Sequence, residues 1–267
     1  MVSISLQRLS RLILGTTFVN LVTAPAFAAD ADTPYPPLLE TKVAYQSPTK
    51  EQKLWALATC AVLTESNRMR HDLLGGCERT AEEAERQQKS LAEWWDVHNR
   101  DDLLKTLKWI EHGGHRQQFD KIVAVLAEGT LAQLKEVQER CETDQAKFNR
   151  VLIALKFGKE FGAKSIAAWD YDRYVALCGW AYVAGYLSEE EAWQRIMPAA
   201  RLLQKTFNSW EDLGKNHVTG REFWSWQQTQ ARGALTRQCY NKLLTDKTSP
   251  WVQLKWNLEL GGPKTKP

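Results

Sequence analysis

The stretch from Trp169 to Leu187, WDYDRYVALCGWAYVAGYL, decides the fold. It is apolar or aromatic on nearly every side, and a helix that is apolar all round is a buried helix. We therefore expect a central helix over about 166–187, surrounded by other helices. The flanking sequence agrees, because alternating patterns typical of strands are scarce.

The same helix-start pattern recurs along the chain: a residue with a side-chain oxygen at the N-cap position, followed three residues later by Glu, Gln or Asp. The pairs are Thr49 with Gln52, Thr80 with Glu83, Asn99 with Asp102, Thr130 with Gln133 and Ser188 with Glu191. Apolar stripes at helical spacing follow several of them: Leu54, Leu57, Ala58, Ala61 and Val62; Phe119, Ile122, Val123 and Leu126; Phe148, Val151, Leu152 and Leu155; Ala192, Ile196, Ala199 and Leu203. These patterns predict an all-α fold, a single multi-helix domain.

The organisation along the chain is read from its glycines and prolines. Helices should stop near Gly75-Gly76, Gly113-Gly114, Gly129 and Gly158. We expect a smaller N-terminal helical part over 49–98, packed against the main helical domain over 99–260, and a flexible tail over 261–267. Residues 29–48 contain Pro34, Pro36, Pro37 and Pro48 and should form an extended leader.

The first 28 residues resemble an export signal. Arg8 and Arg11 precede an uncharged apolar run from Leu12 to Val22, and Ala26-Phe27-Ala28 fits the pattern that signal peptidase cuts after. The run is too short to span a bilayer. The sequence therefore predicts a mature chain that begins at Ala29, in the periplasm or secreted, without membrane insertion after cleavage.

The charge balance excludes a nucleic-acid footprint. Lys and Arg number 35 against 32 Asp and Glu, a formal net charge of +3 that is smaller still once the signal segment is removed. We therefore expect that the protein does not bind nucleic acid.

Five cysteines are present, so at least one is unpaired in an oxidising compartment. Cys60 and Cys77 flank the Gly75-Gly76 turn and are the candidate disulfide pair. Spacing alone does not fix the Cα separation that a bridge needs. Cys178, inside the central helix, is expected to be a small buried residue and not a nucleophile.

Motifs for cofactors and metals are not found. His112 and His115 have H-x-x-H spacing, but Gly113-Gly114 interrupts any helix between them and no third ligand follows at a recognisable spacing. Phosphate-binding glycine loops and the nucleophile elbow are also missing. The sequence predicts neither a metal site nor a cofactor.

Two polar clusters remain as candidates. Asp170 and Arg173 lie three residues apart on the most buried helix, where they share a face and can pair. The pair is either a structural ion pair or part of a cleft. The second cluster contains Trp210, Glu211, Arg221 and Trp224, in which tryptophans either build the core or wall a binding groove.

The chain resembles the DUF1266 family of uncharacterised bacterial proteins, which includes enterobacterial YbeU- and YbeR-like proteins. The resemblance runs from about Trp109 to Trp226. Its carriers are Trp109-Ile110, Gly114-His115-Arg116, Phe119, Trp169-Asp170, Arg173, Gly185-Tyr186, Ser188, Glu191-Ala192-Trp193, Ser209-Trp210-Glu211, Gly220-Arg221 and Phe223-Trp224. The resemblance implies a helical domain without an assigned activity, and no catalytic residue can be transferred.

Function is therefore inferred from the candidate binding residues His115, Arg116, Asp170, Arg173, Trp210, Glu211, Arg221 and Trp224. The leading hypothesis is an exported, non-enzymatic helical protein that binds a protein partner, for example in interbacterial competition. The alternative is an enzyme of unknown class, such as a hydrolase, with a polar site around His115, Asp170, Arg173 and Arg221. The two hypotheses differ in whether these polar residues converge in one place.

Overall fold

The computed structural model of the chain describes residues 47–127 and 144–261, together with 38, 129 and 139. Over these residues the protein is helical and contains no strand, which confirms the predicted all-α fold. The helices are α2 (Lys50–Thr59), α3 (Ala61–Ser66), η1 (Leu74–Gly76), α4 (Ala81–Trp95), α5 (Arg100–Glu111), α6 (Arg116–Ala127), α8 (Gln145–Phe161), η2 (Gly162–Lys164), α9 (Ala167–Ala184), α10 (Glu189–Thr206), α11 (Trp210–Trp224), α12 (Trp226–Thr245) and α13 (Pro250–Gln253).

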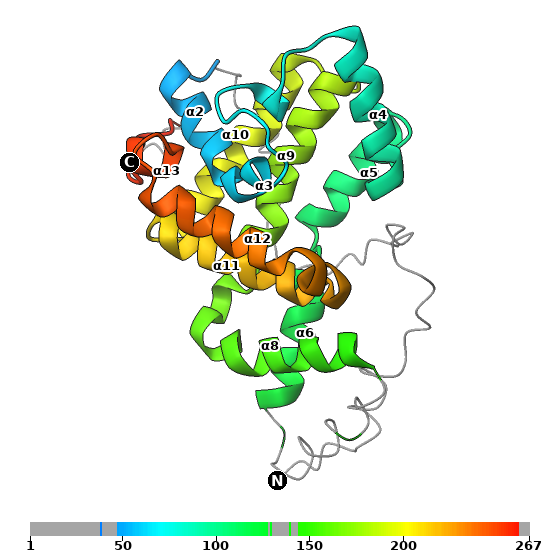
Figure 1. The fold of residues 1–267 in the computed structure, drawn as a ribbon, viewed down its shortest axis with the longest axis vertical. Helices are drawn as coiled ribbons and strands as arrows, with labels where there is room; N and C mark the ends of the chain where they lie inside the picture. Colours follow the sequence, from blue (N-terminus) through cyan, green and yellow to red (C-terminus); the bar gives the residue numbers. More distant parts are fainter. Residues whose placement is uncertain (1–37, 39–46, 128, 130–138, 140–143, 262–267) are drawn as a thin grey trace, which may run out of the picture.

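Helix α9 is the predicted central helix. All its residues are buried except the half-buried Trp180 and Tyr182. It contacts α10, α11, α4, α5, α2, α3 and η1, and it runs through the middle of the molecule in Figure 1. Because α9 is covered on all sides, its polar side chains must find partners within the protein.

The helix starts follow the predicted caps. The side chains of Thr49, Thr80, Asn99 and Ser188 each accept a hydrogen bond from the backbone N–H three residues on. Thr49 and Ser188 also form complete capping boxes with Gln52 and Glu191. The predicted start at Thr130 lies outside the described residues.

Helix α8 departs from two expectations. Gly158 was expected to end a helix, but it lies inside α8, where a Cβ would stand only 2.6 Å from a methyl carbon of Val123 on α6. Its role is to let two helices approach, not to cap one. The predicted stripe is also wrong, because Leu152 and Leu155 are 46% and 51% exposed while Ile153 and Ala154 are buried. An unbroken apolar run from Val151 to Leu155 leaves the helical phase undetermined.

Helices α6 and α8 pack together at one end of the molecule, beyond α11 in Figure 1. Phe119 of α6 packs against Phe161 of α8 and Phe223 of α11, with ring centroids 6.4 and 5.3 Å away. This second small core fixes the start of α6 beside the N-terminal end of α9.

Four tryptophans fasten the C-terminal segment to the N-terminal helices, and we call Trp55, Trp210, Trp251 and Trp256 the tryptophan clasp. The indole N–H of Trp55 lies 3.1 Å from the carbonyl oxygens of Lys255 and Trp256. Trp210 donates to Leu254 O at 2.8 Å, and Trp251 donates across to Ala58 O of α2 at 2.7 Å. The indole N–H groups of the clasp therefore supply hydrogen bonds between an irregular C-terminal segment, which has few backbone partners of its own, and the helices beside it.

The expected disulfide between Cys60 and Cys77 is wrong, because both are free thiols. The Cys60 Sγ donates to the carbonyl of Leu57 at 3.3 Å, within its own helix turn. The Cys77 Sγ lies 3.9 Å from the carbonyl oxygen of Gly75. Each thiol thus has its own local partner. Cys141 lies outside the described residues.

None of the described helices combines the length and the apolar composition that a bilayer crossing requires.

Candidate functional site

Asp170 is the centre of a buried polar group on α9. Its Oδ2 accepts from the Nη1 of Arg116 and from the Arg116 backbone N–H, both at 3.0 Å. Its Oδ1 accepts from the His115 backbone N–H at 3.1 Å and from the Nη2 of Arg173. We call His115, Arg116, Asp170 and Arg173 the arginine cluster. The predicted contact between Asp170 and Arg173 is present, and two residues from α6 and its N-terminal edge complete it.

The carboxylate of Asp170 also caps helix α6 from outside. The backbone N–H groups of His115 and Arg116 stand at the start of α6, where helices leave donors unsatisfied. The chain reaches this position through Gly114, whose φ is +51°. A Cβ on Gly114 would stand 2.5 Å from the Oδ2 of Asp170. Glycine is therefore required for both the backbone conformation and the close approach.

Ionisation of Asp170 is strongly favoured. Burial alone would raise the pKa of its carboxyl group, but the positive charges of Arg116 and Arg173 outweigh burial. The pKa of Asp170 consequently lies well below its usual range. Each carboxylate oxygen already accepts two hydrogen bonds, so Asp170 has little capacity left to act as a base.

Arg173 is held among three indole rings. Its guanidinium carbon lies 4.3 Å from the ring centroid of Trp169, 5.4 Å from that of Trp95 and 6.0 Å from that of Trp109. Its Nε donates to Trp169 O at 2.8 Å. Nη1 makes no hydrogen bond to any residue that the structure describes. Burial lowers the pKa of Arg173 to about 10, which leaves it charged near neutral pH.

His115 links the arginine cluster to solvent, with 19% of its side chain exposed. Its Nδ1 lies 2.8 Å from the Nη2 of Arg173. A guanidinium can only donate, so Nδ1 must accept, and the remaining proton sits on Nε2. Burial and the charge of Arg173 lower the pKa of His115 to about 4, which agrees with a neutral ring. The accessible edge of His115 therefore presents an Nε2–H donor.

The sequence reasoning missed a second buried pair beside the arginine cluster. The Nδ1 of His217, on α11, lies 2.8 Å from the Oδ2 of Asp172 on α9, and both residues are almost completely buried. Burial raises the pKa of Asp172 and lowers that of His217 to about 3, so the uncharged pair is favoured. The two residues lie 45 positions apart, and no local spacing signals their contact.

Trp169 connects the two polar groups. Its ring centroid lies 6.4 Å from that of His115 and 5.4 Å from that of His217. Within the described part of the chain, its buried Nε1 and the Oδ1 of Asp172 have no hydrogen-bond partner. A tryptophan that would ordinarily pair its N–H when buried is used here for its ring faces.

The other predicted binding residues do not join this group. Trp210 belongs to the tryptophan clasp, and Glu211 is exposed at the start of α11. Arg221 is half-buried one turn after His217, and its charge contributes to the lowered pKa of His217. Trp224 packs 5.6 Å from Trp169. The candidate set therefore separates into the arginine cluster, its aromatic surroundings and the clasp.

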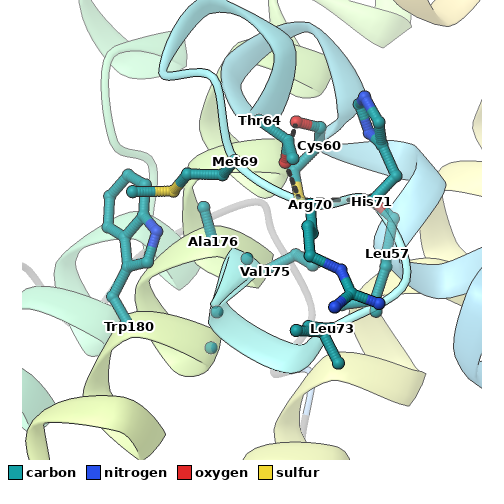
Figure 2. A pocket seen from close by; sticks show the side chains of 13 residues that line it. Leu57, Cys60, Thr64, Met69, Arg70, His71, Leu73, Val175, Ala176 and Trp180 are labelled. Carbon is teal, nitrogen blue, oxygen red and sulfur yellow. Dashed lines mark hydrogen bonds between the residues drawn. The ribbon is translucent and has the colours of Figure 1, made fainter. Parts of the chain in front are cut away.

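A small cavity lies elsewhere, between α3, the loop before η1 and α9 (Figure 2). Its volume of about 20 Å³ leaves room for roughly one water molecule. The Cys60 thiol faces it, and burial raises the pKa of that thiol to about 12. Met69 extends beside the ring of Trp180 at the other side. This cavity offers neither the space nor a reactive thiolate for chemistry.

Among the described residues, no group of three His, Cys, Asp or Glu side chains is placed to hold an ion. His112 and His115 face different partners, since the Nδ1 of His112 lies 2.8 Å from Lys108 O.

Comparison with known proteins gives one match. The family model described as "Protein of unknown function (DUF1266)" matches residues 90–256, which include α5 to α13, the arginine cluster and most of the clasp. No curated protein and no solved structure matches the chain. Because the matched residues make up more than half of the sequence, the chain belongs to the DUF1266 family.

Proposed function

We propose that this protein is an exported binding protein that recognises an anionic group of a protein partner at the arginine cluster. One observation carries the proposal. Arg173 and His115 each keep a donor, Nη1 and Nε2–H, that no described residue uses, and both side chains are fixed by their contacts within the arginine cluster. Such donors, desolvated and held in place by neighbouring groups, bind anions well.

Binding is favoured over catalysis by the state of the acids and bases. Asp170 is saturated with hydrogen bonds, and the Nδ1 of His115 is occupied by Arg173. A general base needs an accessible lone pair within reach of the substrate. The other acid–base pair, Asp172 with His217, has the right atoms but exposed fractions of 0% and 1%. These features count against the hydrolase alternative.

Export rests on the N-terminal segment. A basic start, an apolar run and the Ala26-Phe27-Ala28 site occur in the order that secretion requires. Sequencing the N-terminus of the exported product should find Ala29 as its first residue. An intact Met1 in a membrane fraction would contradict this part of the proposal.

The binding function is tested by affinity capture with the mature chain, residues 29–267. We compare wild type with His115→Phe, which keeps an aromatic ring but removes the donor, and with His98→Phe as a matched control at an exposed histidine. A partner retained by wild type and by His98→Phe, but lost from His115→Phe, supports the proposal. Equal retention by all three proteins, or no specific partner for wild type, contradicts it.

A further inference from the structure

We infer that the groove formed by α2, α10 and the start of α11 is a binding site for a non-helical segment of a partner protein, and that residues 254–260 of this chain fill it as a built-in ligand. We call these residues the C-terminal strap. The strap lies beside α2 in Figure 1. The inference does not rest on the arginine cluster, and three observations on how the strap is held carry it.

The first observation is that the helices hold the strap by its backbone carbonyl groups. Four side chains of the groove supply the donors: Trp210 to Leu254 O at 2.8 Å, Trp55 to Lys255 O and Trp256 O at 3.1 Å, Gln204 to Trp256 O and Leu258 O at 2.7 and 2.8 Å, and Gln52 to Glu259 O at 3.0 Å. Every peptide carries carbonyl groups. These hydrogen bonds therefore fix the path of the bound segment without selecting its sequence.

The second observation is that the strap is held by side chains and not by a shared backbone ladder. Among the described residues, no backbone–backbone hydrogen bond joins the strap to α2, α10 or α11. The backbone N–H groups of Leu254 and Leu258 donate to carbonyls close by in the sequence, those of Pro250 and Lys255. A different segment can therefore take the place of the strap without breaking the hydrogen bonds of any helix.

The third observation is that the burial of the strap alternates from residue to residue. Its apolar side chains are buried or half-buried and the residues between them are exposed, in the order Leu254, Trp256, Leu258 and Leu260 against Lys255, Asn257 and Glu259. Grooves that bind peptides combine hydrogen bonds to the main chain with contacts to alternate side chains, and the side-chain contacts give the specificity. The ligand is thus a segment with apolar residues at every second position and polar residues between them.

Trp256 is the anchor of the strap. Its ring centroid lies 5.2 Å from that of Trp55 and 4.8 Å from that of Trp210, edge to face in the second case. Trp55 and Trp210 lie 4.8 Å apart, so two rings that stand on helices form the seat of a third ring. Tryptophans in such seats dominate the energy of many protein interfaces. We therefore expect the partner segment to carry a tryptophan at the second of its apolar positions.

A partner segment must replace the strap, which is tethered to its own groove. A short tether gives a local concentration on the order of millimolar, so the groove of the wild-type chain is closed to weakly binding peptides. Loss of the anchoring ring should weaken the strap and leave the side chains of the groove in place. The inference is tested by opening the groove in this way.

The test measures the binding of a fluorescein-labelled peptide with the sequence of residues 254–261, LKWNLELG, to the mature chain by fluorescence anisotropy. We expect Trp256→Ala to bind this peptide at least about tenfold more tightly than wild type does. Val252→Ala is the matched control, because Val252 is exposed on α13 and lies outside the strap. It should bind the peptide as wild type does.

Further variants locate the binding. Adding Gln204→Met to Trp256→Ala removes the donor to two carbonyl groups and should weaken binding about fivefold or more. A peptide with alanine in place of its tryptophan, and one of the same composition with consecutive apolar residues, should each bind at least about tenfold more weakly than LKWNLELG. If circular dichroism shows Trp256→Ala to be unfolded, Leu258→Ser takes its place, with the same expected direction.

Three outcomes would overturn the inference. Equal binding of LKWNLELG to wild type and to a folded Trp256→Ala chain would make the strap a fixed part of the fold. Equal binding of LKWNLELG and the rearranged peptide would make the contact unspecific. A concentration-dependent dimer of the wild-type chain in sedimentation would assign the groove to the strap of a second copy. None of these results bears on capture through His115, which tests the proposed function.

Discussion

The tryptophan clasp and the arginine cluster use the same residue type in opposite ways. In the clasp, the N–H groups of Trp55, Trp210 and Trp251 donate to backbone carbonyls, so the polar edge of each ring serves the fold. At the arginine cluster, Trp169 turns its ring face to a guanidinium, and its buried N–H lacks a partner among the described residues. The difference teaches that tryptophan content alone does not distinguish a ring that ties segments together from a ring that packs against a charged group; the partner of each indole N–H does.

The largest effect is expected at Asp170. Asp170→Ala leaves two guanidinium groups and the start of α6 without their acceptor, and breaking a buried ion pair costs about 3–5 kcal/mol. Adding Arg173→Met should recover only part of this loss, because it removes only one of the two guanidinium groups that pair with Asp170. Denaturant unfolding measures both values, with the exposed Asp101→Ala as the control. An Asp170→Ala protein within about 1 kcal/mol of wild type would refute the cluster's structural role.

Gly114→Ala should destabilise next most strongly. The new Cβ meets the Asp170 carboxylate in addition to the strain of a positive φ, so we expect a loss of about 2–4 kcal/mol. Gly185→Ala is the matched control, since Gly185 also has a positive φ but its Cβ would meet only Arg79, at 3.7 Å. The difference between the two free energies of unfolding isolates the contact with Asp170. Equal losses would show that this contact is unimportant.

A substitution in the tryptophan clasp should have a smaller effect, and it should change the stability of the protein but not its anion binding. Trp55→Phe removes the donor to the carbonyls of Lys255 and Trp256 and keeps most of the ring, so a loss of about 1–3 kcal/mol is expected. Anion binding should be unchanged, unlike in His115→Phe. Trp94→Phe, at an exposed ring, is the control. Weakened anion binding in Trp55→Phe would contradict the assignment of stability to the tryptophan clasp and of anion binding to the arginine cluster.

The smallest expected effect concerns how the stability of the protein depends on pH. The pKa of His115 is lowered to about 4 in the folded protein, whereas an unfolded histidine titrates near 6.5. The unfolded state therefore binds more protons between these values, and stability falls as the pH drops from about 6.5 to 4. His115→Gln should make this fall shallower without removing it, because His217 has a lowered pKa of about 3 and contributes in the same direction. An unchanged slope would contradict the neutral state assigned to His115.

Local features were largely predictable from the sequence. The caps at Thr49 and Ser188 and the buried central helix follow from short-range spacing and from apolar content, and the structure contains them. The contact between Asp170 and Arg173 also follows, because residues three apart on a helix share a face.

Long-range features were not predictable. Arg116 reaches Asp170 across 54 positions, and His217 reaches Asp172 across 45. Such pairs depend on how helices cross, which periodicity does not specify. The same limit explains the wrong disulfide, since a turn between Cys60 and Cys77 says nothing about where each thiol points. Gly158 was misread because a glycine that permits helix crossing and one that ends a helix look alike in sequence.

The most direct test of the account is the protonation state of His115, read from the ¹⁵N chemical shifts of its imidazole at neutral pH. If Arg173 donates to Nδ1, then Nδ1 carries no proton and Nε2 does, which leaves Nε2–H available to a ligand. We predict this neutral Nε2–H tautomer in the wild-type protein at neutral pH. A proton on Nδ1, in either the other tautomer or an imidazolium, would contradict the arrangement on which the proposed binding function rests.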